Sequence, residues 1–127
     1  MKYVVDSSGW IHYLLNGPLA ERYAGYIQKP SNVLTPAIVV YEVYKTVKRS
    51  VNEGLACEAI SALHDTVMVP LDSYLARSAA DISLNHKLSM ADAIVYATAE
   101  KYGVPLCTCD SDFKDLPGVE YVSAEEE

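Results

Sequence analysis

Four carboxylates stand close to the points where a predicted strand ends or a predicted helix begins. Asp6 follows the apolar run "YVV", and Asp110 lies two residues after the run 104–108. Glu42 lies about two turns into the helix expected in the second quarter of the chain, and Asp92 lies in the first turn of a later helix. In an open parallel sheet, ligands bind at the edge where the carboxyl ends of the strands meet. We therefore expect these four carboxylates to converge at that edge.

Carboxylates that crowd together repel one another and raise one another's pKa, unless a divalent cation neutralises them. Oxygen-only ligands favour Mg²⁺ or Mn²⁺, whereas the three histidines fall in separate predicted helices without a metal-ligand spacing. A carboxylate-held Mg²⁺ keeps open positions for water and for a phosphate oxygen. The expected chemistry is hydrolysis of a phosphodiester.

Each carboxylate also has a purely structural interpretation. Asp92 completes the pattern Ser-x-x-Asp, which resembles a capping box. Glu42 lies in an almost wholly apolar stretch, where Lys45 at i+3 fits as a compensating cation. Asp6 is placed to accept hydrogen bonds from backbone amides of the next helix, and the aspartates of "CDSDF" fit a loop that caps a short helix. Only their convergence favours a site.

Short β-branched runs alternate with longer helical segments, and this alternation indicates an α/β fold with helices on both faces of a parallel sheet. The predicted strands are 2–6, 33–35, 67–69, 104–108 and 119–122. The predicted helices are 8–15, 19–27, 36–53, 55–65, 73–86 and a last one between Ser89 and Gly103. In this scheme Thr35 caps the third helix, Pro36 is its first residue and Gly54 ends it.

Composition limits the classes of protein that the chain can belong to. Its 127 residues, half of them apolar, suit one domain spanning 1–127, with 124–127 as an acidic tail. No run of eighteen apolar residues occurs, and the three cysteines have no disulfide-like spacing, so we expect no membrane span and a cytoplasmic location. The net charge of −7 argues against broad nucleic-acid binding through a basic surface.

Four motifs together carry a resemblance that covers essentially the whole chain: "YVVDSS", "YEVYK", "LSMADAIVYATA" and "LCTCDSDF". In their order and approximate spacing they resemble the PIN domain, most closely the small VapC-type toxins of toxin–antitoxin pairs. The resemblance implies a PIN-like three-layer α/β/α domain with a short central parallel sheet of about five strands. It also implies an endoribonuclease that depends on Mg²⁺ or Mn²⁺.

The resemblance also assigns residues to roles. It places the family's acidic quartet on Asp6, Glu42, Asp92 and Asp110. Asp112 matches a further, more variable acidic position and is expected to serve a second ion. Thr108 matches a small hydroxyl residue beside the quartet, and Ser7 is a second candidate for contact with water or metal. The hypothesis is that Asp6, Asp92 and Asp110 hold one ion while Glu42 helps to orient the attacking water.

Substrate and partners follow partly from the residues and partly from the resemblance. Lys45 and Arg49 follow Glu42 at i+3 and i+7, so they share its helix face and are candidates for RNA contact. For Lys48 and Arg49 the alternative is that basic residues late in a helix favour the macrodipole. The resemblance implies a homodimer and a cognate antitoxin. Two alternatives remain at this level: a PIN-fold nuclease of RNA maturation, and a receiver-like signalling domain that collects carboxylates and Mg²⁺ in the same way.

Overall fold

A five-stranded, wholly parallel sheet forms the centre of the molecule, described here from a computed structural model for residues 1–123. The predicted acidic tail at 124–127 lies outside the described residues. The strands are β1 (Tyr3–Val5), β2 (Val33–Pro36), β3 (Val67–Val69), β4 (Leu106–Thr108) and β5 (Val119–Tyr121). Their order in the sheet is β3-β2-β1-β4-β5. All five predicted strands are confirmed, and most are shorter than the apolar runs that predicted them.

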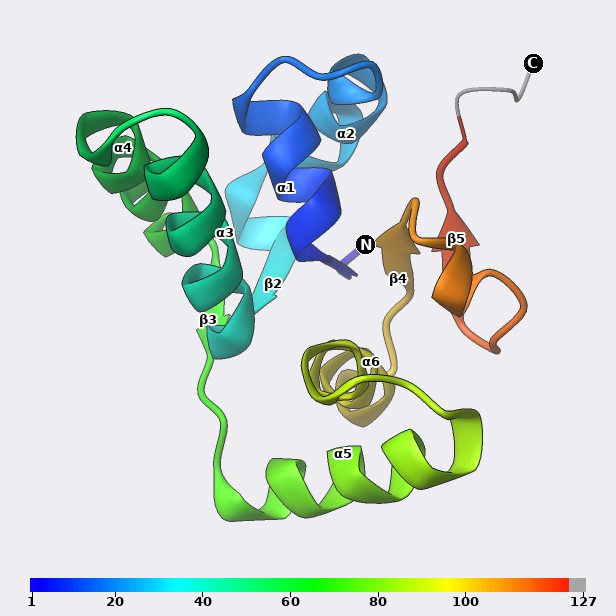
Figure 1. Cartoon of the computed structure of the whole chain (residues 1–127). Coiled ribbons are helices and arrows are strands. Elements are labelled where there is room, and N and C mark those ends of the chain that lie inside the picture. The colour runs from blue at the N-terminus through cyan, green and yellow to red at the C-terminus, as the bar shows by residue number, and fades with distance from the viewer. Residues whose placement is uncertain (124–127) are drawn as a thin grey trace.

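Helices cover both faces of this sheet (Figure 1). They are α1 (Ser7–Leu14), α2 (Ala20–Ile27), α3 (Ala37–Ser50), α4 (Glu53–His64), α5 (Ser73–His86) and α6 (Met90–Tyr102). The chain steps from β1 to β2 to β3 in one direction, so right-handed crossovers place α1 to α4 on one face. The return from β3 to β4 then places α5 and α6 on the other face. The three-layer α/β/α architecture is confirmed.

The direction of winding reverses between two neighbouring strands. β1 leads away to β2 on one side, while β4 pairs with β1 on the other, in a register that joins Val4 to Leu106 and Val5 to Cys107. In doubly wound sheets a crevice opens at such a reversal, beyond the carboxyl ends of the strands. The residues that immediately follow β1 and β4 therefore lie on either side of this crevice.

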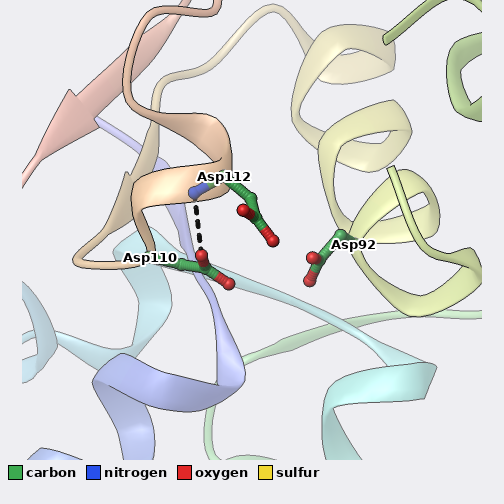
Figure 2. Close-up of side chains that lie close together, drawn as sticks. All are labelled: Asp92, Asp110 and Asp112. Atoms are coloured by element: carbon green, nitrogen blue, oxygen red, sulfur yellow. Dashed lines mark hydrogen bonds between the residues drawn. The ribbon is translucent and has the colours of Figure 1, made fainter. Parts of the chain in front are cut away.

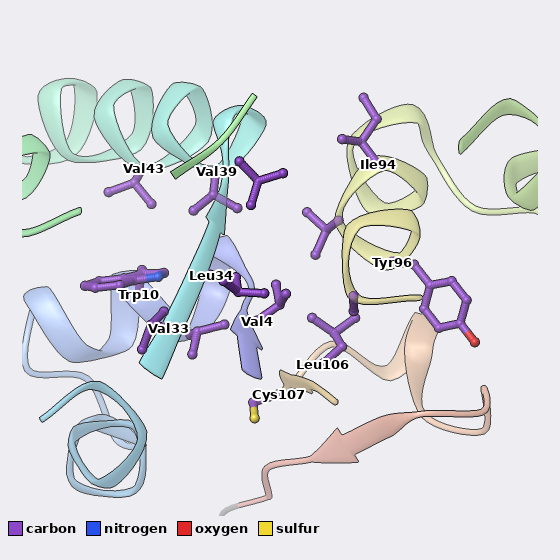
Figure 3. Close-up of a cluster of buried hydrophobic side chains, with 14 of the residues drawn as sticks. Val4, Trp10, Val33, Leu34, Val39, Val43, Ile94, Tyr96, Leu106 and Cys107 are labelled. Atoms are coloured by element: carbon purple, nitrogen blue, oxygen red, sulfur yellow. The ribbon is translucent and has the colours of Figure 1, made fainter. Parts of the chain in front are cut away.

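Apolar side chains of the sheet pack against helices on each side (Figure 3). Trp10 of α1 is fully buried beside Val39 and Val43 of α3, and Ile94 of α6 is buried on the opposite face of the sheet. α6 carries an unbroken buried run from Ala93 to Ala99, as expected of a helix that is covered both by the sheet and by α5. This packing fixes the first turn of α6, and hence Asp92, relative to the strand ends.

The predicted junctions around the third helix are wrong in three respects, the first being that Pro36 ends β2 and precedes α3 instead of being its first residue. Thr35 belongs to β2, and its buried hydroxyl is 2.6 Å from that of Thr66 instead of capping α3. Gly54 lies inside α4, whereas the break falls at Val51 and at Asn52, whose side chain accepts a hydrogen bond from the Leu55 amide. The boundary between α3 and α4 is therefore set by the N-cap Asn52, and not by Gly54 as predicted.

The predicted bounds of α5 and α6 are confirmed, and a cap defines an end of each helix. The Asp72 side chain accepts a hydrogen bond from the Leu75 amide at the start of α5, and Gly103 adopts φ +64° at the end of α6. Among residues 1–123, no helix is both long enough and apolar enough to span a bilayer.

Candidate metal centre

Three aspartates bring their carboxylates together at the carboxyl edge of the sheet (Figure 2). Asp92 projects from α6 toward Asp110 and Asp112, which come from the loop after β4. One carboxylate oxygen from each of the three lies within 4.8 Å of the others. Asp92 and Asp110 are half-buried, and Asp112 is exposed. We call these three side chains the aspartate cluster.

Local capping orients the members of the aspartate cluster. The Ser89 hydroxyl accepts a hydrogen bond from the Asp92 amide at 3.4 Å, so Asp92 sits at the third position of α6. Asp110 caps the short 3-10 turn Ser111–Phe113 in the same manner, because its carboxylate accepts from the Asp112 amide at 2.9 Å. The capping interpretation is thus confirmed for Asp110, whereas at the start of α6 the Ser89 side chain is the cap and Asp92 contributes its backbone amide.

Asp6 lies beside the aspartate cluster but outside it. Its carboxylate is 5% exposed and accepts hydrogen bonds from the Gly9 amide at 3.1 Å and from the Ser8 hydroxyl at 3.0 Å. The Thr108 hydroxyl donates a third at 2.5 Å and accepts from the Asp110 amide at 3.0 Å. Thr108 therefore links the residue that ends β1 to the loop that carries two of the clustered aspartates.

Burial and mutual repulsion perturb two of the carboxylates. Burial raises the pKa of Asp6 to about 6, against the lowering effect of its hydrogen bonds, and Asp110 adds to the rise. The pKa of Asp92 is also raised to about 6, first by burial and then by the charges of Asp110 and Glu42. Carboxylates that raise one another's pKa in this way are a common feature of sites that bind a cation.

Glu42 lies within electrostatic reach of Asp92, as its contribution to that pKa demonstrates. It is half-buried in the second turn of α3, whose start packs against α6. Lys45, the cation expected to compensate it, instead donates a hydrogen bond to the Tyr41 hydroxyl at 3.4 Å. Lys45 and Arg49 both lie on the exposed side of α3. Beyond burial, the charges of Asp110, Glu42 and Asp6 all raise the pKa of Asp92, and Asp112 joins Asp92 and Asp110 in the aspartate cluster.

The hydroxyl residue that contacts Asp6 is Ser8, whereas the sequence analysis named Ser7. Ser7 is the first residue of α1, whereas Ser8 is the residue whose hydroxyl reaches both Asp6 oxygens. Ser8 also approaches Cys109, with 3.5 Å between Oγ and Sγ. The spacing Asp-x-Ser carried this information, because a side chain at the second helical position is close to the capping residue. The role predicted for Ser7 stays a prediction.

The donor set of the aspartate cluster suits a hard divalent cation. All its groups are carboxylate oxygens, and Mg²⁺ and Mn²⁺ prefer oxygen ligands. The nearby Cys107 does not compete as a ligand, since it is buried and burial raises the pKa of its thiol to about 12. The described residues include no His-containing group with metal-ligand geometry.

Comparison with protein families agrees with this architecture. The family model for the PIN domain matches residues 3–119. The chain belongs to the PIN domain family. That membership confirms the resemblance carried by the four motifs and removes the receiver-like alternative. No curated protein sequence matches the chain.

Several solved structures share the fold over nearly the full length of both chains. A chain of a toxin–antitoxin complex from Klebsiella pneumoniae has a TM-score of 0.80 at 23% identity, with 99% of this chain and 100% of that chain covered. VapC20 of Mycobacterium tuberculosis, described as a toxin that cleaves the sarcin–ricin loop, has a TM-score of 0.79 at 22% identity, with 94% and 98% covered. DNA-bound VapBC from Salmonella typhimurium gives 0.75 at 15% identity, with 98% of each chain covered.

Proposed function

We propose that this PIN domain protein is an endoribonuclease that depends on Mg²⁺ or Mn²⁺. The observation that carries the proposal is the aspartate cluster, which lies beside the buried Asp6 at the crevice between β1 and β4. A cation bound by these carboxylates would activate a water and neutralise a phosphate oxygen. The fold relatives include a toxin that cuts RNA, which supports the same activity.

The side chains divide into three roles in this proposal. Asp92 and Asp110 hold the cation, with Asp112 at the exposed side of the same cluster as a third ligand or the ligand of a second ion. Asp6 adds the fourth negative charge, and the Thr108 and Ser8 hydroxyls keep it ionised and oriented. Glu42 on α3, whose charge acts on Asp92, helps to orient the attacking water. Ser7 stays a candidate for contact with water.

The biological setting that we infer is a toxin–antitoxin pair in the cytoplasm. Neighbours in fold are chains of toxin–antitoxin complexes from several bacteria, and these neighbours match this chain end to end. A cognate antitoxin that covers the crevice would keep such a nuclease silent. The alternative is a nuclease of RNA maturation with the same fold. In that case no protein encoded beside it would block cleavage, whereas a toxin has an antitoxin that does.

We also propose that the chain forms a homodimer through α5 and α6. A cavity of about 540 Å³ lies between these helices and is lined mainly by apolar side chains. Around it Leu84 is 79% exposed, Met90 71% and Leu71 43%. Light scattering on the purified chain is expected to give twice the monomer mass, and Leu84→Asp is expected to give the monomer. A monomeric wild-type protein would contradict this proposal.

The proposed activity is tested by cleavage of a mixed RNA panel. Purified protein, freed of any co-purifying partner, is assayed with Mg²⁺, Mn²⁺ or EDTA, beside Asp92→Asn and Asp110→Asn. Each substitution is expected to lower the cleavage rate at least about 100-fold, because an oxygen ligand loses its charge. Asp65→Asn is the matched control, since Asp65 ends α4 before β3 begins, at the opposite edge of the sheet. Cleavage that survives EDTA or both substitutions would overturn the proposal.

A further inference from the structure

Two side chains to which the proposed function gives no role lie close to Asp6. Cys109 belongs to the loop after β4, and its Sγ atom is 3.5 Å from the Oγ atom of Ser8. Tyr23 belongs to α2, and its side chain is fully buried. Neither residue is acidic, so neither can replace a member of the aspartate cluster, and any contribution to the site must pass through Asp6.

The hydrogen bonds around Ser8 can run in one direction only. The Ser8 hydroxyl lies 3.0 Å from both Asp6 oxygens, and an ionised carboxylate can only accept, so the single hydroxyl hydrogen points to Asp6. The contact between Ser8 and Cys109 must then use the thiol hydrogen, with the Ser8 oxygen as the acceptor. Donation therefore runs from Cys109 through Ser8 to Asp6.

Thr108 forms a second chain of the same kind. Its hydroxyl donates to Asp6 at 2.5 Å and accepts from the Asp110 amide at 3.0 Å. That chain is fixed by a backbone amide, whereas the chain through Ser8 begins at a thiol, which is a weak donor on a side chain that can rotate. The Cys109 thiol would hold Ser8 more firmly if its sulfur accepted a hydrogen bond of its own.

The Tyr23 hydroxyl is the group placed to provide that hydrogen bond. Among residues 1–123, this buried hydroxyl has no hydrogen bond of ordinary geometry. Burial raises its pKa, and the charge of Asp6 and the Cys109 thiol add to the rise, so both groups lie within reach of it. An unpaired buried hydroxyl destabilises a fold, and a phenylalanine would fill the same space without that cost. Packing alone therefore gives no reason for the hydroxyl.

The absence of a side chain at Gly9 allows the Tyr23 ring to reach this place. A Cβ atom on Gly9 would lie 2.7 Å from Cζ, the ring carbon that carries the hydroxyl. Gly9 also donates its amide to Asp6 at 3.1 Å. The His12 ring stacks on the Tyr23 ring with 6.3 Å between their centroids, which fixes the plane of the ring. The hydroxyl edge of Tyr23 is thus held against the turn that donates to Asp6.

We propose that Cys109 and Tyr23 are positioning residues of the metal centre: the Tyr23 hydroxyl donates to the Cys109 thiol, the thiol donates to Ser8, and Ser8 donates to Asp6. We call Tyr23, Cys109 and Ser8 the donor chain. Hydrogen bonds in a chain polarise one another, so a donor at the far end strengthens the bond that reaches the carboxylate. Outer partners of this kind commonly alter metal affinity. This inference rests on the proposed function and adds to it two residues outside the acidic set.

Binding of Mn²⁺, measured by isothermal calorimetry at pH 7.5, tests the donor chain without an RNA substrate. Tyr23→Phe, which removes only the hydroxyl, and Cys109→Ala are each expected to raise the Kd for Mn²⁺ about 3-fold or more. The double variant is expected to bind like Cys109→Ala alone, because both substitutions interrupt the same chain. Cys109→Ser can both donate and accept, so its Kd is expected to stay within about 2-fold of the wild-type value.

Tyr26→Phe and Cys57→Ala are the matched controls. Tyr26 follows Tyr23 by one turn of α2, and its hydroxyl donates to Glu120 at 2.6 Å. Cys57 is exposed on α4. Both controls are expected to leave the Kd for Mn²⁺ unchanged. If Tyr23→Phe and Cys109→Ala lowered the stability in urea but left this Kd at the wild-type value, their role would be merely structural and the inference would be overturned.

Urea denaturation in EDTA tests the donor chain in the absence of metal. Tyr23→Phe is expected to shift the urea midpoint less favourably in the wild-type background than in the Cys109→Ala background, because only the wild type offers a thiol to the hydroxyl. Equal shifts in the two backgrounds would overturn the chain. A wild-type protein that does not bind Mn²⁺ would instead contradict the proposed function, and the comparison in EDTA would still decide whether the chain forms.

Discussion

At the scale of single residues, hydrogen bonds to the buried Asp6 carboxylate stabilise its ionised form. Asp6 is nearly inaccessible, and burial alone would keep it protonated near neutral pH. Thr108 lowers that pKa by donating to it, while accepting from the Asp110 amide. The Thr108 hydroxyl therefore both lowers the pKa of Asp6 and holds the backbone of the loop after β4.

Thr108→Val tests this double role. The substitution keeps the shape of the side chain, but it removes one of the three groups that donate hydrogen bonds to the buried Asp6 carboxylate, and it removes the hydroxyl that accepts from the Asp110 amide. We expect the free energy of unfolding to fall by about 1–3 kcal/mol, and the RNA cleavage rate of the remaining folded protein to fall as well. Chemical denaturation and a cleavage assay measure the two effects. Thr108→Ser keeps both hydrogen bonds, so a serine variant as impaired as the valine variant would contradict this account.

Residue identities at the site could largely be predicted from the sequence. The position of Asp6 at a strand end, and of Asp92 in the pattern Ser-x-x-Asp, is encoded by local periodicity and capping. Ser8 was overlooked, although the spacing Asp-x-Ser places its hydroxyl near the carboxylate of Asp6. The true partner of Lys45 was also missed, since Tyr41 competes with Glu42 for the same ammonium group.

At the scale of elements, α1 and α2 pack so closely that one position admits only glycine. A Cβ atom on Gly9 would lie 2.3 Å from the Tyr23 ring, which is fully buried and belongs to α2. The same glycine donates its amide to Asp6. The contact between the two helices and the orientation of the carboxylate are therefore coupled through the first turn of α1.

A pair of alanine substitutions tests this coupling. Gly9→Ala is expected to destabilise the fold by about 1–3 kcal/mol, because the Tyr23 ring must move. Gly25→Ala in α2 meets nothing within 4 Å and is expected to stabilise it by about 0.5–1 kcal/mol, through helix propensity. Urea denaturation of both variants measures the difference. Equal effects of the two substitutions would show that the close approach of Gly9 and Tyr23 carries no energetic weight.

Element types were predictable and some junctions were not. Alternating apolar runs gave five strands and six helices, because a parallel sheet buried on both faces has a distinctive pattern. The boundary between α3 and α4 was misplaced because Gly54 seemed the natural stop, whereas Asn52 caps the next helix and the glycine fits its first turn. Three strands, β1, β4 and β5, were predicted too long, since pairing with a neighbour and not hydrophobicity determines where a strand stops.

At the scale of the whole molecule, the crowded acidic charge lowers the stability of the fold at neutral pH, and a bound cation would offset this cost. Asp6 and Asp92 have a folded-state pKa of about 6, raised from 3.8, so each binds protons more tightly in the folded than in the unfolded chain. Their contribution to stability is therefore complete below about pH 4 and is lost as the pH rises through 6. The metal-free protein carries this penalty at neutral pH.

Thermal unfolding in EDTA at pH 5 and pH 7.5 measures the penalty. These two groups are expected to lower the free energy of unfolding at pH 7.5 by about 1–3 kcal/mol relative to pH 5, after allowance for the solvent exposure of Asp92. Asp92→Asn is expected to show a flatter pH dependence, because one of the two titrating groups is absent. Identical pH dependence in the wild type and this variant would contradict the electrostatic account.

Direct binding of Mn²⁺ tests the central claim, that the aspartate cluster is a metal centre. Isothermal calorimetry is performed at pH 7.5 on the wild type, Asp92→Asn and the matched control Asp65→Asn. Saturable binding by the wild type and the control, weakened at least about 10-fold in Asp92→Asn, is the predicted result, because affinity follows the number of charged ligands. No binding by the wild type, or equal affinity in all three proteins, would contradict the account.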